Sequence, residues 1–251
     1  MNPYEGKSVD TWLSITQKLV DEHPLKPFVV EICLNSWKSM LEGKFNDRLN
    51  RRVKDMSLTP QATGALLHDL IPEYVEANEI KGFRKGRSNN EKDIVCIFND
   101  GLSIEIKTSS QSKIYGNRSY AVSDTGKGKS GYYITINFER TDKKNPEILF
   151  IKMGWLDHTD WHGQKSQTGQ QASISKDVWE NKLITLHKLQ IDINTADYER
   201  LQTLEGIGPT TAQKIIDHRE ANGKYESVDD LFDVKGVREK TVKYLQDAII
   251  I

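Results

Sequence analysis

The sequence predicts an α/β domain, with a mixed β-sheet flanked by helices, followed by a small all-α domain. Three observations lead to this fold class. Helical periodicity dominates the first 80 residues. Short runs rich in β-branched and aromatic residues follow between residues 92 and 156. From residue 191 onward a unit of about 30 residues occurs twice, so we expect one domain at residues 1–189 and a second at residues 190–251.

The composition is that of a globular chain without an overall attraction to nucleic acid. Of the 251 residues, 37% are hydrophobic and 28% are charged, and the net charge is −1. Any DNA binding must therefore depend on local patches of charge. No run approaches the roughly 18 apolar residues of a membrane span, and the polar N-terminus is no signal peptide. We expect a cytoplasmic protein without a membrane partner, in which Cys33 and Cys96 are buried free thiols.

Three helices are predicted before the first strand. Residues 7–42 predict two helices separated by prolines, and the second ends near Gly43. A third helix begins at Thr59, because Pro60 suits the first helical position, and Pro72 kinks or ends it. Its apolar stripe is expected to consist of Ala62, Ala65, Leu66 and Leu70.

Residues 92–110, KDIVCIFNDGLSIEIKTSS, predict a β-hairpin whose turn is residues 99–101, with glycine in the left-handed position. Side chains along a strand alternate between its two faces, so this register places six apolar residues on one face. They are Ile94, Cys96, Phe98, Leu102, Ile104 and Ile106. The other face carries Asp93, Glu105 and Lys107, which are expected to converge at the end away from the turn.

Positive charge gathers on both sides of this hairpin. Residues 107–131 contain five basic residues and one acid, and residues 81–87, KGFRKGR, are basic without any acid. By contrast, residues 191–251 carry a net charge of −4, which leaves +3 on residues 1–190. A DNA-contacting surface near the hairpin and a merely solvated loop are both compatible with these charges.

Residues 131–139 and 146–156 predict two further strands.

The charged face of the hairpin has the residue types and spacing of PD-(D/E)XK nucleases. Hydrolysis of a phosphodiester needs a divalent cation, which offsets developing charge and lowers the pKa of bound water. Asp93, Glu105 and the backbone carbonyl of Ile106 offer the oxygen ligands that Mg²⁺ prefers, and the sequence leaves open whether Mn²⁺ substitutes for it. Lys107 would position the attacking water or help to deprotonate it. The pattern alone is weak, because a surface hairpin with a cross-strand ion pair has the same residues.

Two weaker metal candidates lie elsewhere. Glu73 follows the third predicted helix, where nucleases of this class often place a glutamate beside the metal, but an exposed glutamate after a proline is an equal alternative. Asp157, His158 and Asp160 lie between two tryptophans. Packing of the indoles beside polar loop residues is favoured there over a second metal site.

Four segments of the chain resemble the ScaI family of type II restriction endonucleases. They are MNPYEGKSVDTWLSITQKLVDEHPL, KDIVCIFNDGLSIEIKTSS, IYGNRSYAVSDTGKGKSGYYITINFE and FIKMGWLDHTDWHGQKSQTGQQASI, and the similarity covers most of residues 1–187. The resemblance implies a PD-(D/E)XK fold, Mg²⁺ dependence, a homodimer and double-strand cleavage at a short palindrome, with a cognate DNA methyltransferase as system partner. It assigns the same catalytic set: Asp93, Glu105 and Lys107.

Candidate DNA contacts of this first domain lie in loops around the strands. They are Lys113, Asn117, Arg118, Ser119, Lys127, Lys129, Gln164 and Gln170. Asn and Arg side chains can pair with adenine and guanine edges in the major groove. The lysines are better suited to phosphates, which position a protein on DNA without specifying sequence. Phosphate contact alone, or a solvated linker, is the alternative for the Asn-Arg turn and for the glutamine-rich loop.

Residues 191–251 resemble a tandem helix-hairpin-helix domain of competence DNA receptors and repair proteins. In such hairpins glycines let backbone N–H groups approach a phosphate at a helix N-terminus. The candidate contacts are Gly206, Gly208, Thr210, Thr211, Lys214, Gly236, Arg238 and Lys240. The second hairpin departs from the pattern, because Arg238 stands where a second glycine is usual. A dimer contact or a structural cap is the alternative role for this acidic tail.

The leading prediction is a homodimeric, Mg²⁺-dependent type II restriction endonuclease that binds double-stranded DNA. A structure-selective repair or recombination nuclease of the same fold is the second hypothesis. A non-catalytic DNA-binding or uptake protein is the third, and the complete set of Asp93, Glu105 and Lys107 argues against it.

Overall fold

The computed structural model describes residues 2–44, 50–121, 130–143, 145–165, 169–204 and 206–251. The chain forms two compact units, Met1–His187 and Lys188–Ile251. The first unit contains two clusters of buried apolar side chains, and the second contains a separate cluster of its own. Within the described residues, no helix has the length and apolar character needed to cross a membrane.

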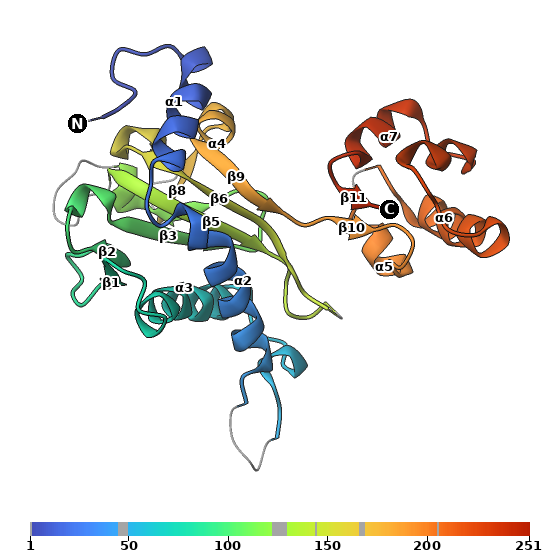
Figure 1. The fold of residues 1–251 in the computed structure, drawn as a ribbon, viewed down its shortest axis with the longest axis horizontal. Helices are drawn as coiled ribbons and strands as arrows, with labels where there is room; N and C mark the ends of the chain where they lie inside the picture. Colours follow the sequence, from blue (N-terminus) through green and yellow to red (C-terminus); the bar gives the residue numbers. More distant parts are fainter. Residues whose placement is uncertain (1, 45–49, 122–129, 144, 166–168, 205) are drawn as a thin grey trace. The chain divides into compact units, whose positions relative to one another are not determined.

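Three helices cover one face of the main sheet in the first unit (Figure 1). They are α1 (Val9–Asp21), α2 (Lys26–Glu42) and α3 (Pro60–Ala77). The prediction of two helices within residues 7–42 and of a third beginning at Thr59 is confirmed. The Thr59 hydroxyl caps α3 by accepting a hydrogen bond from the backbone N–H of Ala62 at 3.2 Å. Pro72 lies inside α3 and does not end it.

The predicted apolar stripe of α3 is wrong in part. Ala62 and Ala65 are exposed, and the residues that α3 buries are Thr63, Gly64, Leu67, Ile71, Pro72 and Val75. The reason is a close approach to strand β3 (Ile104–Ser109), where the Thr108 hydroxyl donates to the Gly64 carbonyl at 3.0 Å. A Cβ on Gly64 would lie 2.9 Å from that hydroxyl oxygen. Because α3 meets β3 at Gly64, the helix buries the face that contains this glycine instead of the predicted stripe.

The main sheet has six strands in the order β1-β2-β3-β5-β6-β9. Strands β3 and β5 are parallel, whereas β1 with β2, β2 with β3, and β5 with β6 are antiparallel. The sheet is therefore mixed and flanked by helices, which confirms the predicted α/β fold. The other strands are β1 (Phe83–Lys85), β2 (Ile94–Cys96), β5 (Gly131–Phe138), β6 (Ile148–Leu156) and β9 (Leu183–Lys188).

The predicted register of the hairpin is wrong by two residues. Ile94 pairs with Ile104, because the connection is longer than the expected three-residue turn and contains a 3₁₀ turn, η2 (Asp100–Leu102). Gly101 does not adopt the expected left-handed conformation. Phe98 is therefore 74% exposed and leaves the apolar face. A shift of two preserves the alternation of faces, so Ile94, Cys96, Ile104 and Ile106 are buried together as predicted.

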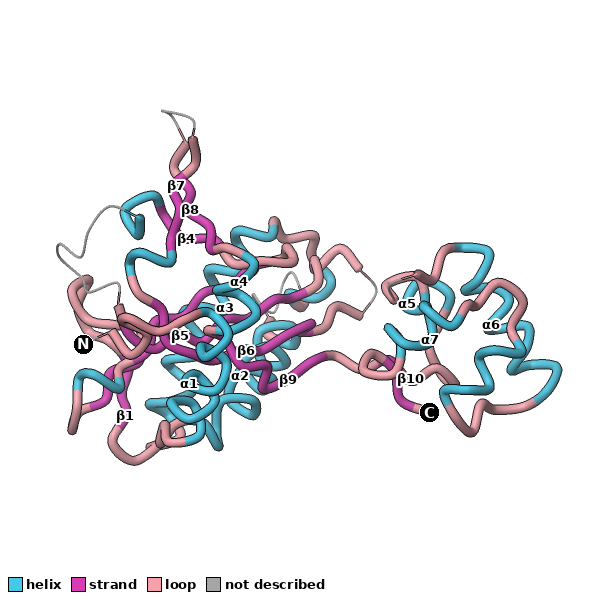
Figure 2. The backbone as a smooth tube through the Cα atoms, turned by 90° about the horizontal axis from the view of Figure 1, so that it is seen from above, coloured by secondary structure: helices cyan, strands magenta, loops and turns pink. Residues whose placement is uncertain are grey.

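A three-stranded antiparallel sheet packs against the opposite face of the main sheet through a second apolar cluster. We call it the small sheet; its order is β4-β8-β7, and Figure 2 shows β7 and β8 extending away from the main sheet. Its strands are β4 (Tyr115–Asn117), β7 (Trp161–Gly163) and β8 (Gln171–Ile174). Two 3₁₀ turns, η3 (Arg118–Ala121) and η4 (His158–Asp160), and helix α4 (Lys176–Asn181) adjoin it.

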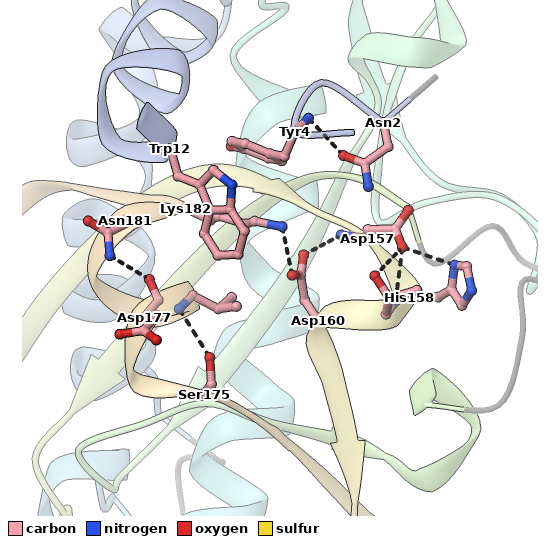
Figure 3. A network of polar contacts seen from close by, with 12 residues as sticks. Asn2, Tyr4, Trp12, Asp157, His158, Asp160, Ser175, Asp177, Asn181 and Lys182 are labelled. Carbon is pink, nitrogen blue, oxygen red and sulfur yellow. Dashed lines mark hydrogen bonds and ion pairs between the residues drawn. The ribbon is translucent and has the colours of Figure 1, made fainter. Parts of the chain in front are cut away.

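A buried ion pair joins the start of β9 to this region (Figure 3). The Lys182 ammonium lies 2.7 Å from Asp160 Oδ1, and both side chains are almost fully buried. The same ammonium lies over the rings of Tyr4 and Trp12, at 4.3 and 4.2 Å from their centroids. Asp160 Oδ2 also accepts a hydrogen bond from the backbone N–H of Asp157 at 2.8 Å. The acidic cluster noticed in the sequence therefore holds a buried lysine.

The second unit consists of short helices and one pair of two-residue strands. It contains α5 (Tyr198–Leu201), α6 (Pro209–Asn222), the 3₁₀ helix η5 (Val228–Asp233) and α7 (Glu239–Leu245). Two strands that the sequence did not predict, β10 (Ile191–Asp192) and β11 (Ile249–Ile250), pair in parallel and join the two ends of the unit. Each has two residues, too few to show an alternating pattern.

The repeat of about 30 residues is confirmed by reciprocal contacts between the two halves of this unit. Gly206 and Gly236 both have positive φ, of 82° and 110°, a conformation that favours glycine. A Cβ on Gly206 would lie 3.3 Å from the Thr241 side chain, and one on Gly236 would lie 3.9 Å from the Thr211 hydroxyl. Each half thus places its glycine turn against the same threonine position of the other half.

The buried ion pair gives the first prediction. Asp160→Ala would leave the Lys182 ammonium buried without its counter-ion, and we expect the free energy of unfolding to fall by about 3 kcal/mol. Chemical denaturation followed by circular dichroism measures the change. The control is Lys176→Ala, which removes the partner of Glu180 from an exposed pair at 3.7 Å and should leave the midpoint nearly unchanged. Equal losses in the two variants would contradict the importance of the buried pair.

Candidate active site

Asp93, directly before β2, lies together with Glu105 and Lys107 of β3. The Lys107 ammonium donates to Glu105 Oε1 at 2.8 Å and to the carbonyl of Ile106 at 3.0 Å. The backbone N–H of Ile106 donates to Asp93 Oδ2 at 2.7 Å. Because Ile94 pairs with Ile104, the register continued by one residue places Asp93 across from Glu105. The predicted convergence of these side chains is thus present in the structure.

The position of the charges follows from the alternation of β3. Ile104 and Ile106 are fully buried under the helices, so Glu105 and Lys107 must face the other side of the sheet. On that side their partners in β5 are Tyr133 and Thr135. Strand β5 pairs with β3 along its whole length, while on the other edge β2 pairs at Ile104 and the Asp93 carboxylate accepts the N–H of Ile106, so the backbone that carries the two charged side chains is held from both sides.

Asp93 is held in its ionised form. Burial by itself opposes ionisation, but the hydrogen bond and charge of His68, the charge of Lys107 and the N–H of Ile106 outweigh it. Together these groups hold the pKa of Asp93 well below its usual range. Glu105 is 4% exposed and is in contact with the Lys107 ammonium. The site therefore brings two acids together with the basic groups that stabilise them.

His68 is a site residue that the sequence reasoning missed. It lies on α3 with Nε2 3.2 Å from Asp93 Oδ2 and Nδ1 3.1 Å from Asp69 Oδ1. The hydrogen bond to Asp93 raises the pKa of His68, and burial opposes that rise. His68 is four residues after Gly64, the point where α3 touches β3, so the two positions share one face of the helix. No pattern in the sequence indicates that this glycine lies against the strand.

Tyr120 is the second residue that was missed. Its hydroxyl, on η3, donates a hydrogen bond to Glu105 Oε1, and the Lys107 ammonium lies 4.7 Å from the centroid of its ring. Burial and the negative charge of Glu105 raise the pKa of Tyr120, so the hydroxyl keeps its proton at neutral pH. Tyr120 is 15 residues from Glu105 in the chain, and no spacing rule connects the two.

Glu73 lies at a different place from the other candidates. It is within α3, and its carboxylate pairs with Lys85 on β1. The structure thus brings His68, rather than Glu73, from this helix to Asp93.

The oxygens of the site fit a Mg²⁺ ion. One ammonium group reaches both Glu105 Oε1 and the Ile106 carbonyl, so these oxygens already converge on a single cation. Asp93 is tied to the same residue through the N–H of Ile106. Among the described residues no three His, Cys, Asp or Glu side chains form a metal-binding group. Two carboxylates and a carbonyl are nevertheless sufficient for Mg²⁺, which usually keeps waters and takes phosphate oxygens from its substrate.

The small sheet gathers most of the candidate DNA contacts of the first unit. Asn117 ends β4, and Arg118 and Ser119 begin η3. The backbone N–H of Arg118 donates to the Gln170 carbonyl at 2.7 Å, and its guanidinium donates to the Gly169 carbonyl at 3.3 Å. Gln164, on the neighbouring strand connection, donates its backbone N–H to Gln171 at 3.0 Å.

Of the three lysines among the candidate DNA contacts of the first unit, the structure describes one. Lys113 is half-buried in the connection between β3 and β4. Lys127 and Lys129 lie outside the described residues.

In the second unit the candidate residues surround the two glycine turns. Gly208 precedes α6 as its N-cap, and Thr210 and Thr211 lie in the first turn of that helix. Lys214 donates to the carbonyl of Lys235 at 3.0 Å, which links the first hairpin to the second. The ammonium of Lys240, on α7, lies 5.8 Å from the Tyr244 ring.

Arg238 departs from the repeat without backbone strain. It is the N-cap of α7 with φ −117°, an ordinary value for any residue. The equivalent Gly208 also has a negative φ, of −89°, and a Cβ there would meet nothing within 4 Å. Gly236, in contrast, has a positive φ. The fold therefore requires the first glycine of each turn and tolerates a side chain at the second.

Comparison with known proteins agrees with this arrangement. The family described as ScaI restriction endonuclease matches residues 2–187. The chain belongs to this family. It is 40% identical to the type II restriction enzyme ScaI of Streptomyces caespitosus over 194 residues, which are 74% of this chain and 85% of that enzyme.

The tail matches a different family. The helix-hairpin-helix motif family matches residues 187–250. ComE operon protein 1 of Bacillus subtilis (strain 168) is 33% identical over 85 residues, which are 34% of this chain and 38% of that protein. An uncharacterized protein of Haemophilus influenzae is 34% identical over 62 residues, covering 24% of this chain and 55% of that protein. The ScaI-family member therefore carries a helix-hairpin-helix DNA-binding domain at its C-terminal end.

The contact between His68 and Asp93 gives the second prediction. In metal-free protein the pKa of His68, followed by NMR of its ring protons, should lie above the ordinary 6.5. In Asp93→Asn the principal cause of the rise is lost while burial remains, so the pKa should fall below 6.5. His187, whose pKa burial lowers, is the control and should titrate identically in both proteins. An unchanged His68 titration would show that the two side chains do not interact in solution.

Proposed function

We propose that the protein is a metal-dependent type II restriction endonuclease of the PD-(D/E)XK class, which cuts both strands of DNA at a short palindrome. The observation that carries the proposal is the convergence of Asp93, Glu105 and Lys107 on one face of β3, in a chain of the ScaI family.

Each residue of the site has a distinct task in this proposal. Asp93, Glu105 and the Ile106 carbonyl would hold Mg²⁺, which when bound offsets charge on the scissile phosphate and lowers the pKa of a bound water. Among the described residues, the Lys107 ammonium makes two hydrogen bonds, to Glu105 and to the Ile106 carbonyl. An ammonium has three donors, and the third would hold the attacking water. His68 and Tyr120 would fix the two carboxylates.

Cleavage of a palindrome implies a second copy of the chain. A palindromic duplex has two-fold symmetry, which a symmetric homodimer matches. Within the described residues each chain contributes one set of Asp93, Glu105 and Lys107, so two copies would supply one set to each strand. A DNA methyltransferase of the same specificity would protect the host's own sites. Mn²⁺ should substitute for Mg²⁺, because both take oxygen ligands.

Recognition of DNA would be divided between the two units. The small sheet offers Asn117, Arg118 and Gln170, whose side chains can pair with base edges. In the tail, the glycine turn before α6 would approach a phosphate with its backbone N–H groups, helped by Thr210 and Thr211. The net charge of −4 on residues 191–251 limits this second contact to a modest gain in affinity.

The tandem hairpins also suit a nuclease that recognises DNA structure, and one experiment separates the two functions. A long phage DNA of known sequence is digested with and without Mg²⁺, and the fragment ends are sequenced. The proposal predicts discrete, Mg²⁺-dependent fragments whose ends share one short palindrome. Cleavage at ends or junctions without a shared sequence would favour the structure-selective nuclease. No cleavage under any condition would exclude both.

The roles assigned to the acid and the lysine give the third prediction. Glu105→Ala and Lys107→Ala should each abolish cleavage at the site found by digestion, while binding to a duplex that contains the site survives. Gel-shift titration in Ca²⁺ measures the binding. The control is Asp142→Ala, which removes the partner of Arg140 from an exposed pair at 2.8 Å and should leave cleavage unchanged. Full activity in either site variant would refute the assignment.

The division of recognition gives the fourth prediction. Because the tail has its own core, the chain without residues 188–251 should remain folded. It should bind DNA more weakly and with a smaller dependence of log affinity on log salt, because phosphate contacts are lost. Its preferred cleavage sequence should be the same as that of the full chain. A changed preference would show that the tail contributes to sequence recognition.

A further inference from the structure

Tyr120 lies between the small sheet and the candidate catalytic residues. It belongs to η3, which directly follows β4. Two residues before it in the same turn, the backbone N–H of Arg118 donates to the Gln170 carbonyl at 2.7 Å, which ties the turn to the residue that directly precedes β8. The Tyr120 hydroxyl donates to Glu105 Oε1. A single 3₁₀ turn therefore connects the candidate base-reading residues to a candidate metal ligand.

The ring of Tyr120 is packed tightly enough to follow movements of β4. A Cβ on Gly116 would lie 3.2 Å from the Tyr120 ring and 3.1 Å from the Trp161 ring, so β4 has no free space above them. The centroids of Tyr120 and Trp161 are 5.1 Å apart, and those of Trp161 and Tyr133 are 6.0 Å apart. In a close-packed region a shift of one element displaces its neighbours. A displacement of the small sheet must therefore move the Tyr120 ring or be resisted by it.

Tyr120 also contacts two of the three candidate catalytic groups. Its hydroxyl and the Lys107 ammonium both donate to Glu105 Oε1, which restrains the position of that oxygen. Its ring face lies 4.7 Å from the same ammonium. A change in the position of Tyr120 would alter the geometry of Glu105 and Lys107 together.

We propose that Tyr120 is a positioning residue that couples DNA contact on the small sheet to the alignment of Glu105 and Lys107. Matched bases at Asn117 and Arg118 hold η3 in the position in which Tyr120 aligns both groups. A mismatched site leaves η3 displaced and the carboxylate misaligned, so such DNA is bound but cut slowly. Discrimination between sites then occurs in the rate of cleavage as well as in binding. This inference rests on the proposed nuclease function.

The variant Tyr120→Phe tests the coupling, because it keeps the ring and removes the hydrogen bond to Glu105. Tyr115→Phe is the matched control: Tyr115 is on β4, and its hydroxyl makes no hydrogen bond within the part of the chain that the structure describes. Both variants and the wild type are assayed for kcat and KM on a duplex that carries the site found by digestion. The same measurements are made on a duplex with one base pair of that site changed, and thermal unfolding shows that the variants are folded.

We expect Tyr120→Phe to lower kcat on the intact site by about tenfold or more, the size of effect that a lost hydrogen bond to a charged group produces. KM should stay within about twofold. The ratio of kcat on the intact site to kcat on the changed site should fall, because the variant has lost the hydrogen bond to Glu105 through which the intact site raises kcat. Tyr115→Phe should behave as the wild type in each measurement.

Each other outcome overturns the inference. A folded Tyr120→Phe with wild-type kcat would show that the hydrogen bond does not position Glu105. An equal loss of kcat on both duplexes would show positioning without coupling to recognition. A rise in KM alone would make Tyr120 a binding residue. Absence of cleavage by the wild type would instead overturn the proposed function, and the inference with it.

Discussion

The central position of β3 is the constraint on which the site depends. Strand β5 pairs with it along its whole length, β2 pairs with it at Ile104, and the face that carries Ile104 and Ile106 is buried in the apolar cluster shared with the helices. With the backbone held in this way, the alternation of side chains leaves one direction for Glu105 and Lys107. The energetic cost of orienting these charges is met during folding rather than during a reaction, which is the condition for electrostatic preorganisation.

Buried charge in this site is balanced by contacts between acids and bases. Glu105 is in contact with Lys107, and Asp93 is in contact with His68. An isolated carboxylate at such depth would take up a proton, because burial disfavours the charged form. The basic partners instead keep Asp93 ionised. They come from β3 and from α3, so the charge balance exists only when helix and sheet are packed together.

The second unit shows how a repeat can diverge without loss of fold. Gly206 and Gly236 have positive φ and meet the opposite half of the unit, so both glycines are required by the backbone. At the second position of each turn φ is negative, and Arg238 replaces glycine there without strain. The two hairpins thus keep one framework and differ in the residue at this position, a glycine in the first and an arginine in the second.

The sequence by itself determined the α/β class, the N-terminal helices, the repeat in the tail and the charged face of the hairpin. These features arise from local properties: capping at Thr59, the alternation around Ile104 and Ile106, and glycines that need positive φ. The tertiary structure alone decided the hairpin register, the rotation of α3 and the arrival of His68 and Tyr120 at the site. Those depend on which surfaces meet when distant segments pack, and spacing along the chain does not encode such contacts.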